Sequence, residues 1–135
     1  MMVQPYLSFE GRCEEALEFY KGAVGAKVEA VLRFKDAPPD MPTTPDNKEK
    51  VMHSSFRVGD TLVLASDGRC SGKASFSGVT LTLNADSNAE AEKLFGALGK
   101  GGQVQMPMAE TFFAHRFGML ADRFGVNWMV IKSKM

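Results

Sequence analysis

Two segments of the chain echo each other, and this internal repeat constrains the fold more than any other feature of the sequence. The stretch EALEFYKGAVGAKV at residues 15–28 can be laid over EAEKLFGALGKGGQV at residues 90–104 with one gap. The simplest account of an echo at an offset of about 75 residues is a duplicated module.

The first half of the sequence predicts the order β-α-β-β-β. Leu17, Tyr20 and Val24 stand at i, i+3 and i+7, which is the apolar stripe of an amphipathic helix. We expect Gly22 and Gly25 to end that helix. Segments with β character or alternating apolar residues predict four strands, the last two joined by a two-residue hairpin turn: residues 3–9, 26–34, 51–58 and 61–66.

The second half repeats this order. Ser87 and Glu90 have the spacing of a capping box, so a helix should begin there. Its apolar stripe consists of Ala91, Leu94, Phe95 and Leu98. Strands are predicted before and after this helix at residues 78–85, 103–108, about 115–121 and 126–132. The sequence therefore predicts an α+β fold made of two β-α-β-β-β modules.

The modules are expected to form one domain over residues 1–135. Module one covers about 1–66, a Gly- and Ser-rich linker about 67–77, and module two about 78–135. Residues 35–50 hold four of the six prolines and cannot continue a sheet, so they predict an exposed loop. That loop is either a lid or a plain connection.

Composition excludes several classes of partner. Sixteen Lys and Arg residues balance sixteen Asp and Glu residues, so no overall field favours nucleic acid. No run of about 18 apolar residues indicates a membrane span, and the N-terminus does not resemble a signal peptide. Cys13 and Cys70 lack the close spacing of a zinc or redox site. We expect a cytoplasmic protein with reduced cysteines.

Three motifs in the chain resemble a known family: PYLSFEGRCEEALEFY, SGKASFSG and ETFFAHRFGMLADRFGVNWM. They are similar to the PhnB-like branch of the vicinal oxygen chelate superfamily, which includes glyoxalase I, extradiol dioxygenases and the bleomycin and fosfomycin resistance proteins. The resemblance covers nearly the whole chain. It implies a mixed sheet curled like a cup around a small-molecule cavity, with the helices outside, and it implies a homodimer.

The superfamily usually uses a divalent metal, whose ligands come from four strand positions. Alignment of the motifs places those positions near Pro5, Ala65, Gly78 and Met129, none of which offers a usable ligand. A slip of one residue still yields no convincing set. Some PhnB-like sequences carry a demethylubiquinone methyltransferase label, but this chain has no Gly-rich strand-to-helix turn suited to a nucleoside cofactor. We therefore expect no metal and no cofactor.

The candidate catalytic residues are His53, Glu110 and His115. His53 lies in an alternating strand and could bind a substrate oxygen or act as a base near neutral pH. His115 could pair with Glu110 as base and orienter. For both histidines, hydrogen bonding or packing within the fold is the alternative role.

The candidate ligand-binding residues are Phe112, Phe113, Trp128 and Met129. The aromatic residues between 110 and 130 follow no single period, as expected for a segment that turns from loop to strand and back. They either fill the core or line an apolar pocket. Methionines such as Met106 and Met119 would suit an adaptable lining.

These patterns favour a protein that binds or sequesters a small, partly apolar molecule without the usual metal. The alternative is an enzyme of lyase, dioxygenase or transferase type. Such an enzyme would be metal-free, with His53, His115 and Glu110, or would use a divalent metal held by a non-standard set of ligands.

Overall fold

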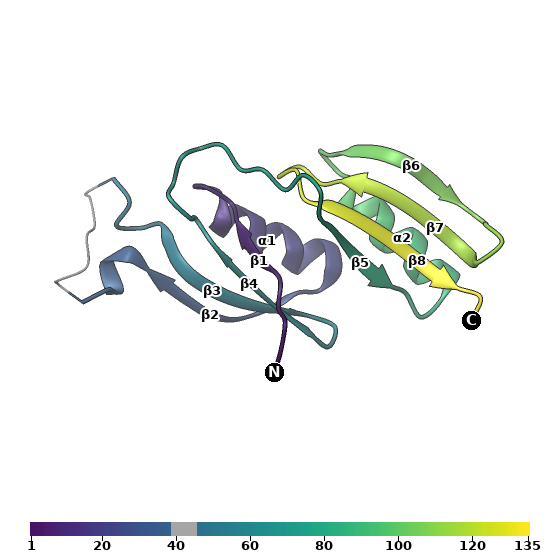
Figure 1. Ribbon diagram of the computed structural model, residues 1–135, viewed down its shortest axis with the longest axis horizontal. Coiled ribbons are helices and arrows are strands. Elements are labelled where there is room, and N and C mark those ends of the chain that lie inside the picture. Colours follow the sequence, from purple (N-terminus) through teal and green to yellow (C-terminus); the bar gives the residue numbers. More distant parts are fainter. Residues whose placement is uncertain (39–45) are drawn as a thin grey trace. The chain divides into compact units, whose positions relative to one another are not determined.

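The computed structural model describes residues 1–38 and 46–135, which divide into two compact units. Unit 1 spans Met1–Ala74 and unit 2 spans Ser75–Met135. Each unit contains one long helix and one four-stranded sheet (Figure 1). No helix within the described ranges is long and apolar enough to cross a membrane.

Unit 1 follows the order β-α-β-β-β. Its elements are β1 (Tyr6–Ser8), α1 (Cys13–Val24), β2 (Lys27–Arg33), a short 3-10 turn η1 (Phe34–Asp36), β3 (Val51–Val58) and β4 (Thr61–Ser66). Its sheet, sheet A, has the strand order β1-β4-β3-β2. Strand β1 runs parallel to β4, and the other pairs are antiparallel. The predicted hairpin at Gly59 is present, with φ of 57° at that glycine.

Unit 2 repeats the same topology. Its elements are β5 (Thr80–Asn84), α2 (Asn88–Leu98), β6 (Gln103–Ala109), β7 (Ala114–Ala121) and β8 (Asn127–Ser133). Sheet B has the order β5-β8-β7-β6, with β5 parallel to β8. The prediction of two β-α-β-β-β modules with mixed sheets is confirmed. The strands form two separate four-stranded sheets rather than one.

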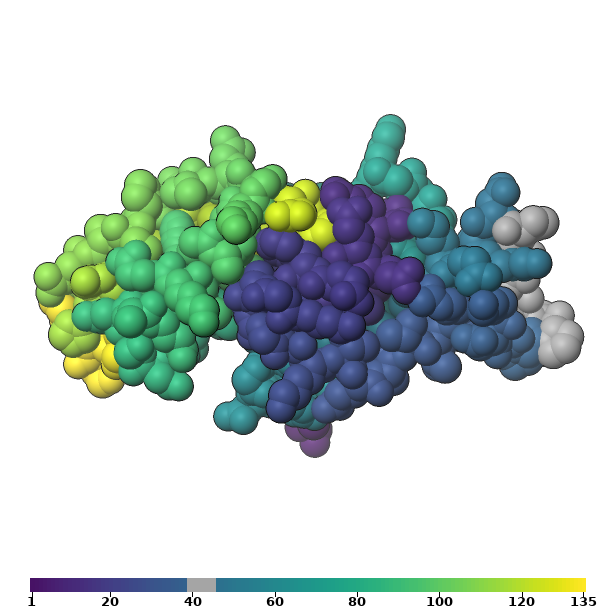
Figure 2. Space-filling model, turned by 180° about the vertical axis from the view of Figure 1, so that it is seen from behind, coloured from purple at the N-terminus to yellow at the C-terminus, as the bar shows by residue number. Residues whose placement is uncertain are grey.

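Helix α1 packs on one face of sheet A through residues at helical spacing. Its buried side chains are Cys13, Ala16, Leu17 and Tyr20, and the space-filling view shows the outer surface of this helix in purple (Figure 2). Tyr20 is fully buried and its ring stacks on Phe56 of β3, with 5.7 Å between centroids. Burial of each such ring contributes about 1.5–3 kcal/mol. This contact fixes which face of β3 is covered.

The ends of the helices differ from the sequence prediction at two points. Gly22 does not end α1, because the helix continues to Val24 and Gly25 caps it with φ of 66°. Ser87 caps α2 as predicted, accepting a hydrogen bond from the Glu90 backbone N–H at 3.0 Å. The Glu90 carboxylate, however, accepts from Asp86 N–H rather than from the cap residue itself.

The predicted loop 35–50 lies partly outside the described residues, which exclude 39–45. On its two described sides, Lys35 N–H donates to the Lys48 carbonyl at 3.0 Å, and Phe34 N–H donates to the Lys50 carbonyl at 3.1 Å. The segments that enter and leave the loop are therefore bonded to each other.

Candidate functional site

One face of sheet B carries a row of methionines. Helix α2 covers the opposite face, since a Cβ at Gly118 would lie 2.9 Å from the Phe95 ring. The face of sheet B that α2 does not cover is called here its open face. On it, Met129 of β8 pairs with Met119 of β7, which pairs in turn with Met106 of β6. Three thioethers thus stand side by side on adjacent strands.

Aromatic rings continue this apolar surface. Phe117 lies two residues from Met119 and therefore on the same face of β7. Its ring meets the edge of the Phe113 ring at 5.2 Å, and Phe113 meets Phe112 in the same way at 5.2 Å. Phe113 is 39% exposed and Phe112 is 93% exposed. The predicted ligand-binding residues Phe112, Phe113 and Met129 all belong to unit 2. The rings of Phe112, Phe113 and Phe117 form one cluster.

The turn that presents these rings is held by several hydrogen bonds. The Thr111 hydroxyl accepts from Phe113 N–H at 3.3 Å and from Ala114 N–H at 3.0 Å. Thr111 N–H donates to the Ala114 carbonyl at 2.9 Å, and Lys134 N–H donates to the Phe113 carbonyl at 3.1 Å. The backbone beneath Phe112 and Phe113 is consequently fixed from both sides.

Glu110 and His115 flank this turn without bonding to each other in the described part of the chain. The Glu110 carboxylate pairs with the Lys134 ammonium at 2.9 Å, and this hydrogen bond lowers the pKa of the carboxyl, with a smaller electrostatic contribution from His115. His115 is exposed at the irregularity in the β7–β8 register between Ala114 and Arg116. The proposed base and orienter are therefore near neighbours but not a hydrogen-bonded dyad.

Trp128 lies on the covered face of sheet B, whereas Met129 lies on the open one. Trp128 is 3% exposed, and its indole N–H donates to the Asp122 carboxylate at 2.9 Å. The other oxygen of that carboxylate accepts from Phe124 N–H at 2.9 Å and Val126 N–H at 3.1 Å. Trp128 thus closes the turn between β7 and β8 and belongs to the core of unit 2.

His53 lies on sheet A, on the face that α1 does not cover. Its neighbours Ser54 and Phe56 face α1, where Ser54 contacts Cys13 and Phe56 stacks on Tyr20. His53 therefore points to the open face of sheet A, together with Ser55. Its Nδ1 atom lies 3.2 Å from the hydroxyl of Tyr6 on β1, two strands away.

Three surface hollows in unit 1 contain none of the predicted site residues. Two of them, of about 440 and 560 Å³, lie beside the start of α1 and share Gly11, Arg12 and Lys50. The third, of about 310 Å³, is lined in part by Gln4, Arg57 and Leu62.

The residues at the superfamily's metal positions do not fit a metal. Pro5 precedes β1, Ala65 is fully buried in β4, Gly78 precedes β5 and Met129 offers only a thioether. Hard and borderline cations need nitrogen or oxygen donors that converge. Within residues 1–38 and 46–135, no three His, Cys, Asp or Glu side chains are grouped as a metal site requires. We derive no reaction step through a metal.

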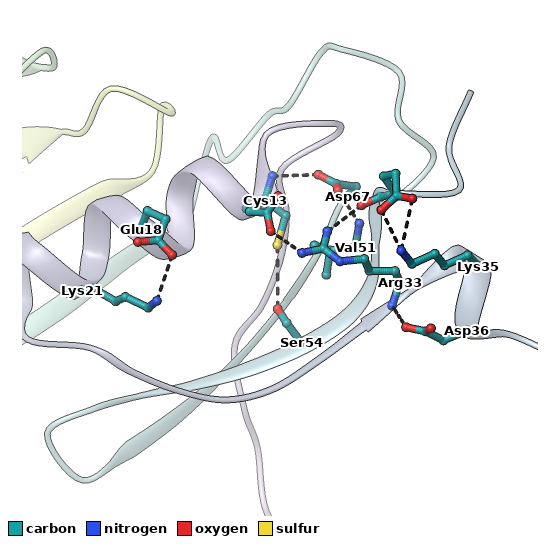
Figure 3. Close-up of polar contacts among 11 residues, drawn as sticks. Cys13, Glu18, Lys21, Arg33, Lys35, Asp36, Val51, Ser54 and Asp67 are labelled. Carbon is teal, nitrogen blue, oxygen red and sulfur yellow. Dashed lines mark hydrogen bonds and ion pairs between the residues drawn. The ribbon is translucent and has the colours of Figure 1, made fainter. Parts of the chain in front are cut away.

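Sequence reasoning missed the structural role of Asp67, which the close-up shows between α1 and sheet A (Figure 3). The side chain is 1% exposed. One carboxylate oxygen accepts from Gly11 N–H at 3.0 Å and Cys13 N–H at 2.7 Å, and the other accepts from Val51 N–H at 2.7 Å. Asp67 thereby caps α1, whose own N-cap residue Arg12 supplies no side-chain bond.

The comparison with known families agrees with this architecture. The family model for 3-demethylubiquinone-9 3-methyltransferase matches residues 1–131. The chain belongs to this family. In sequence, the chain is similar to protein YjdN of Escherichia coli strain K12. The two are 34% identical, and the match covers 96% of this chain and 94% of YjdN.

Solved structures extend the comparison. Protein PA1353 from Pseudomonas aeruginosa is 44% identical and covers 98% of both chains with a TM-score of 0.84. A PhnB protein from Bacillus cereus is 22% identical, with a TM-score of 0.81 over 98% of this chain and 100% of that one. The fosfomycin resistance protein FosX from Mesorhizobium loti shares the fold at 13% identity and a TM-score of 0.64, over 100% of this chain and 92% of that one. The predicted PhnB-like membership and the vicinal oxygen chelate fold are confirmed.

Proposed function

We propose that this protein binds a small, partly apolar molecule on the open face of sheet B, without the metal of its superfamily. The row Met106, Met119 and Met129 supports this function. Thioether side chains are flexible and polarisable, and they make favourable contacts with aromatic rings. The ring cluster of Phe112, Phe113 and Phe117 extends the same surface.

The polar groups along this face suggest what else the molecule carries. Thr82 of β5 pairs with Met129, and its hydroxyl lies 3.9 Å from the Met129 sulfur. Asn84 stands two residues further along β5 on the same face. A few neutral hydrogen-bonding groups beside an apolar surface are typical of small-molecule sites. The expected ligand is uncharged where it meets the methionines.

The methyl transfer in the family's name is not the function proposed. Methyl transfer from a nucleoside cofactor needs a cradle for that cofactor, and the turn before α1 reads FEGRC rather than a Gly-rich sequence. At this turn the N–H groups of Gly11 and Cys13 already donate to Asp67. The anion-binding capacity of this helix start is thus occupied by a side chain of the protein itself.

The test uses the neutral, apolar dye Nile red and a matched pair of variants. Met119→Glu places a carboxylate in the middle of the methionine row, and Ala89→Glu places the same side chain at an exposed position of α2. We expect saturable dye fluorescence for the unmodified protein and for Ala89→Glu. Met119→Glu should bind the dye at least about tenfold more weakly, which corresponds to about 1.4 kcal/mol of binding free energy. Equal affinity for the two variants would place the apolar site elsewhere.

A second measurement separates binding from turnover. Compounds that raise the thermal stability of the protein are identified first, because a ligand of the native state must stabilise it. Each is then incubated with the protein and analysed by mass spectrometry. Recovery of unchanged compound is expected; consumption would replace the binding function by an enzyme using His53, Glu110 or His115.

A homodimer is also proposed, and analytical ultracentrifugation would contradict it by finding only the single chain.

A further inference from the structure

Tyr6 and His53 form a polar pair on the open face of sheet A. Their rings lie 5.7 Å apart, and the Tyr6 hydroxyl is 3.2 Å from Nδ1 of His53. Tyr6 belongs to β1 and His53 to β3, so the contact passes over β4, the strand between them. The pair therefore depends on the folded sheet and not on local sequence.

The contact with the Tyr6 hydroxyl links the tautomer of His53 to the direction of this hydrogen bond. A tyrosine hydroxyl can donate its proton to a bare ring nitrogen. If Tyr6 donates to Nδ1, the proton of neutral His53 must sit on Nε2. In that tautomer the free side of the imidazole is a hydrogen-bond donor.

A hollow lies further along the open face of sheet A. The hollow of about 310 Å³ is lined by Gln4, Arg57 and Leu62 among others. Arg57 and Leu62 are paired across β3 and β4, two residues from the paired Ser55 and Leu64, so both pairs lie on the open face of sheet A. Leu64 is itself paired with Tyr6. The hollow and the Tyr6–His53 pair therefore lie on one face, with Ser55 and Leu64 between them.

We propose that this face of unit 1 binds a small molecule, with Tyr6 positioning His53 so that its Nε2–H donates a hydrogen bond to a carbonyl or carboxylate oxygen of that molecule. The remaining groups on this face suit such a ligand. Ser8 and Ser55 offer hydroxyls, and Arg57 keeps one guanidinium nitrogen beyond its contacts with Glu29 and the Asp60 carbonyl. The inference uses unit 1 alone and does not depend on the site on sheet B.

The tautomer of His53 can be read directly by long-range proton–nitrogen correlation in ¹⁵N-labelled protein at about pH 8, where free imidazole is neutral. The chain has two histidines, so the His115→Gln variant assigns the signals of His53. We expect the Nε2–H form in the unmodified protein and a larger share of the Nδ1–H form in Tyr6→Phe. Ser55→Ala, which alters the same face without touching this hydrogen bond, should leave the tautomer unchanged.

Acetate and acetamide then serve as probes for the two kinds of oxygen. The His53 Nε2–H signal should shift with saturation, and at least about fivefold more probe should be needed in Tyr6→Phe. A response to acetate alone assigns the site to carboxylates, and a response to both assigns it to carbonyl oxygen in general. An Nδ1–H form in the unmodified protein, or shifts that are absent or equal at His53 and His115, would overturn the proposal.

Discussion

Replacement of Asp67 by alanine should strongly destabilise the protein. The substitution removes three hydrogen bonds, to Gly11, Cys13 and Val51, from a site that is 1% exposed. The buried N–H groups of Cys13 and Val51 and the half-buried N–H group of Gly11 would then lack their acceptor.

The size of the effect follows from the number and kind of these bonds. A hydrogen bond to a charged group contributes about 1.5–3 kcal/mol, and a buried donor left without a partner costs about 1–3 kcal/mol. Water entering the space left by the side chain satisfies part of this, and bonds that share one carboxylate are not additive. We therefore expect a loss of about 3–5 kcal/mol, which is large for a single substitution. Asp67→Asn, which keeps one carbonyl oxygen for Gly11 and Cys13, should lose less.

Urea unfolding followed by far-ultraviolet circular dichroism measures this loss, and amide exchange localises it. The amides of Gly11, Cys13 and Val51 should lose protection first in Asp67→Ala. The matched control is Asp86→Ala, which removes an exposed carboxylate that makes no side-chain hydrogen bond among the described residues. If Asp67→Ala and Asp86→Ala agreed within about 0.5 kcal/mol, the typical range for surface changes, the assignment of Asp67 as the helix cap would be refuted.

Two further predictions concern the free energy of unfolding after glycine substitutions and the dependence of stability on pH. Gly118→Ala should lower the free energy of unfolding by about 1–3 kcal/mol, because its Cβ would lie 2.9 Å from Phe95. Gly22→Ala should raise the free energy of unfolding by about 0.5–1 kcal/mol, because Gly22 lies inside α1 with open space around it. Equal melting temperatures for the two variants would contradict both predictions. Burial raises the pKa of the Cys13 thiol from 9.0 to about 12. The buried neutral thiol therefore contributes its full share of the folding stability below pH 9. This share is lost as the pH rises toward 12, at up to about 1.4 kcal/mol per pH unit. Cys13→Ala should flatten that alkaline slope in urea titrations, and a slope unchanged by the substitution would show that another group causes it.

The regular elements could be predicted because their signals are local. Alternation over residues 51–58 and 61–66, joined at Gly59, identified the hairpin of β3 and β4 with its bounds. The Ser87 cap identified the start of α2. Gly22 was misread because a glycine in a helix costs only about 1 kcal/mol, which the burial of Tyr20 outweighs.

The contacts of single side chains could not be predicted because they join distant parts of the chain. Asp67 and Cys13 are 54 positions apart, and Tyr6 and His53 are 47 apart. For Trp128 the sequence left core and pocket lining both open, because nothing in its surroundings reveals that Asp122 folds back to accept its N–H. The alternation in β8 does place Trp128 and Met129 on opposite faces, but it does not say which face the helix covers.

The pairing of each unit's first strand with its last one also governs the order in which the chain can assemble. The hairpins β3–β4 and β7–β8 join neighbouring segments and can form early, whereas β1 has no partner until β4 has been synthesised, and β5 none until β8. Closure of a long loop precedes such a pairing, so it is the slow, high-contact-order event of folding. On the ribosome, unit 1 has all its strands once Ser66 has emerged, while β5 waits for a strand that ends at Ser133. An interrupted chain that lacks β8 would leave the edge of β5 unpaired, and such an edge is a template for aggregation.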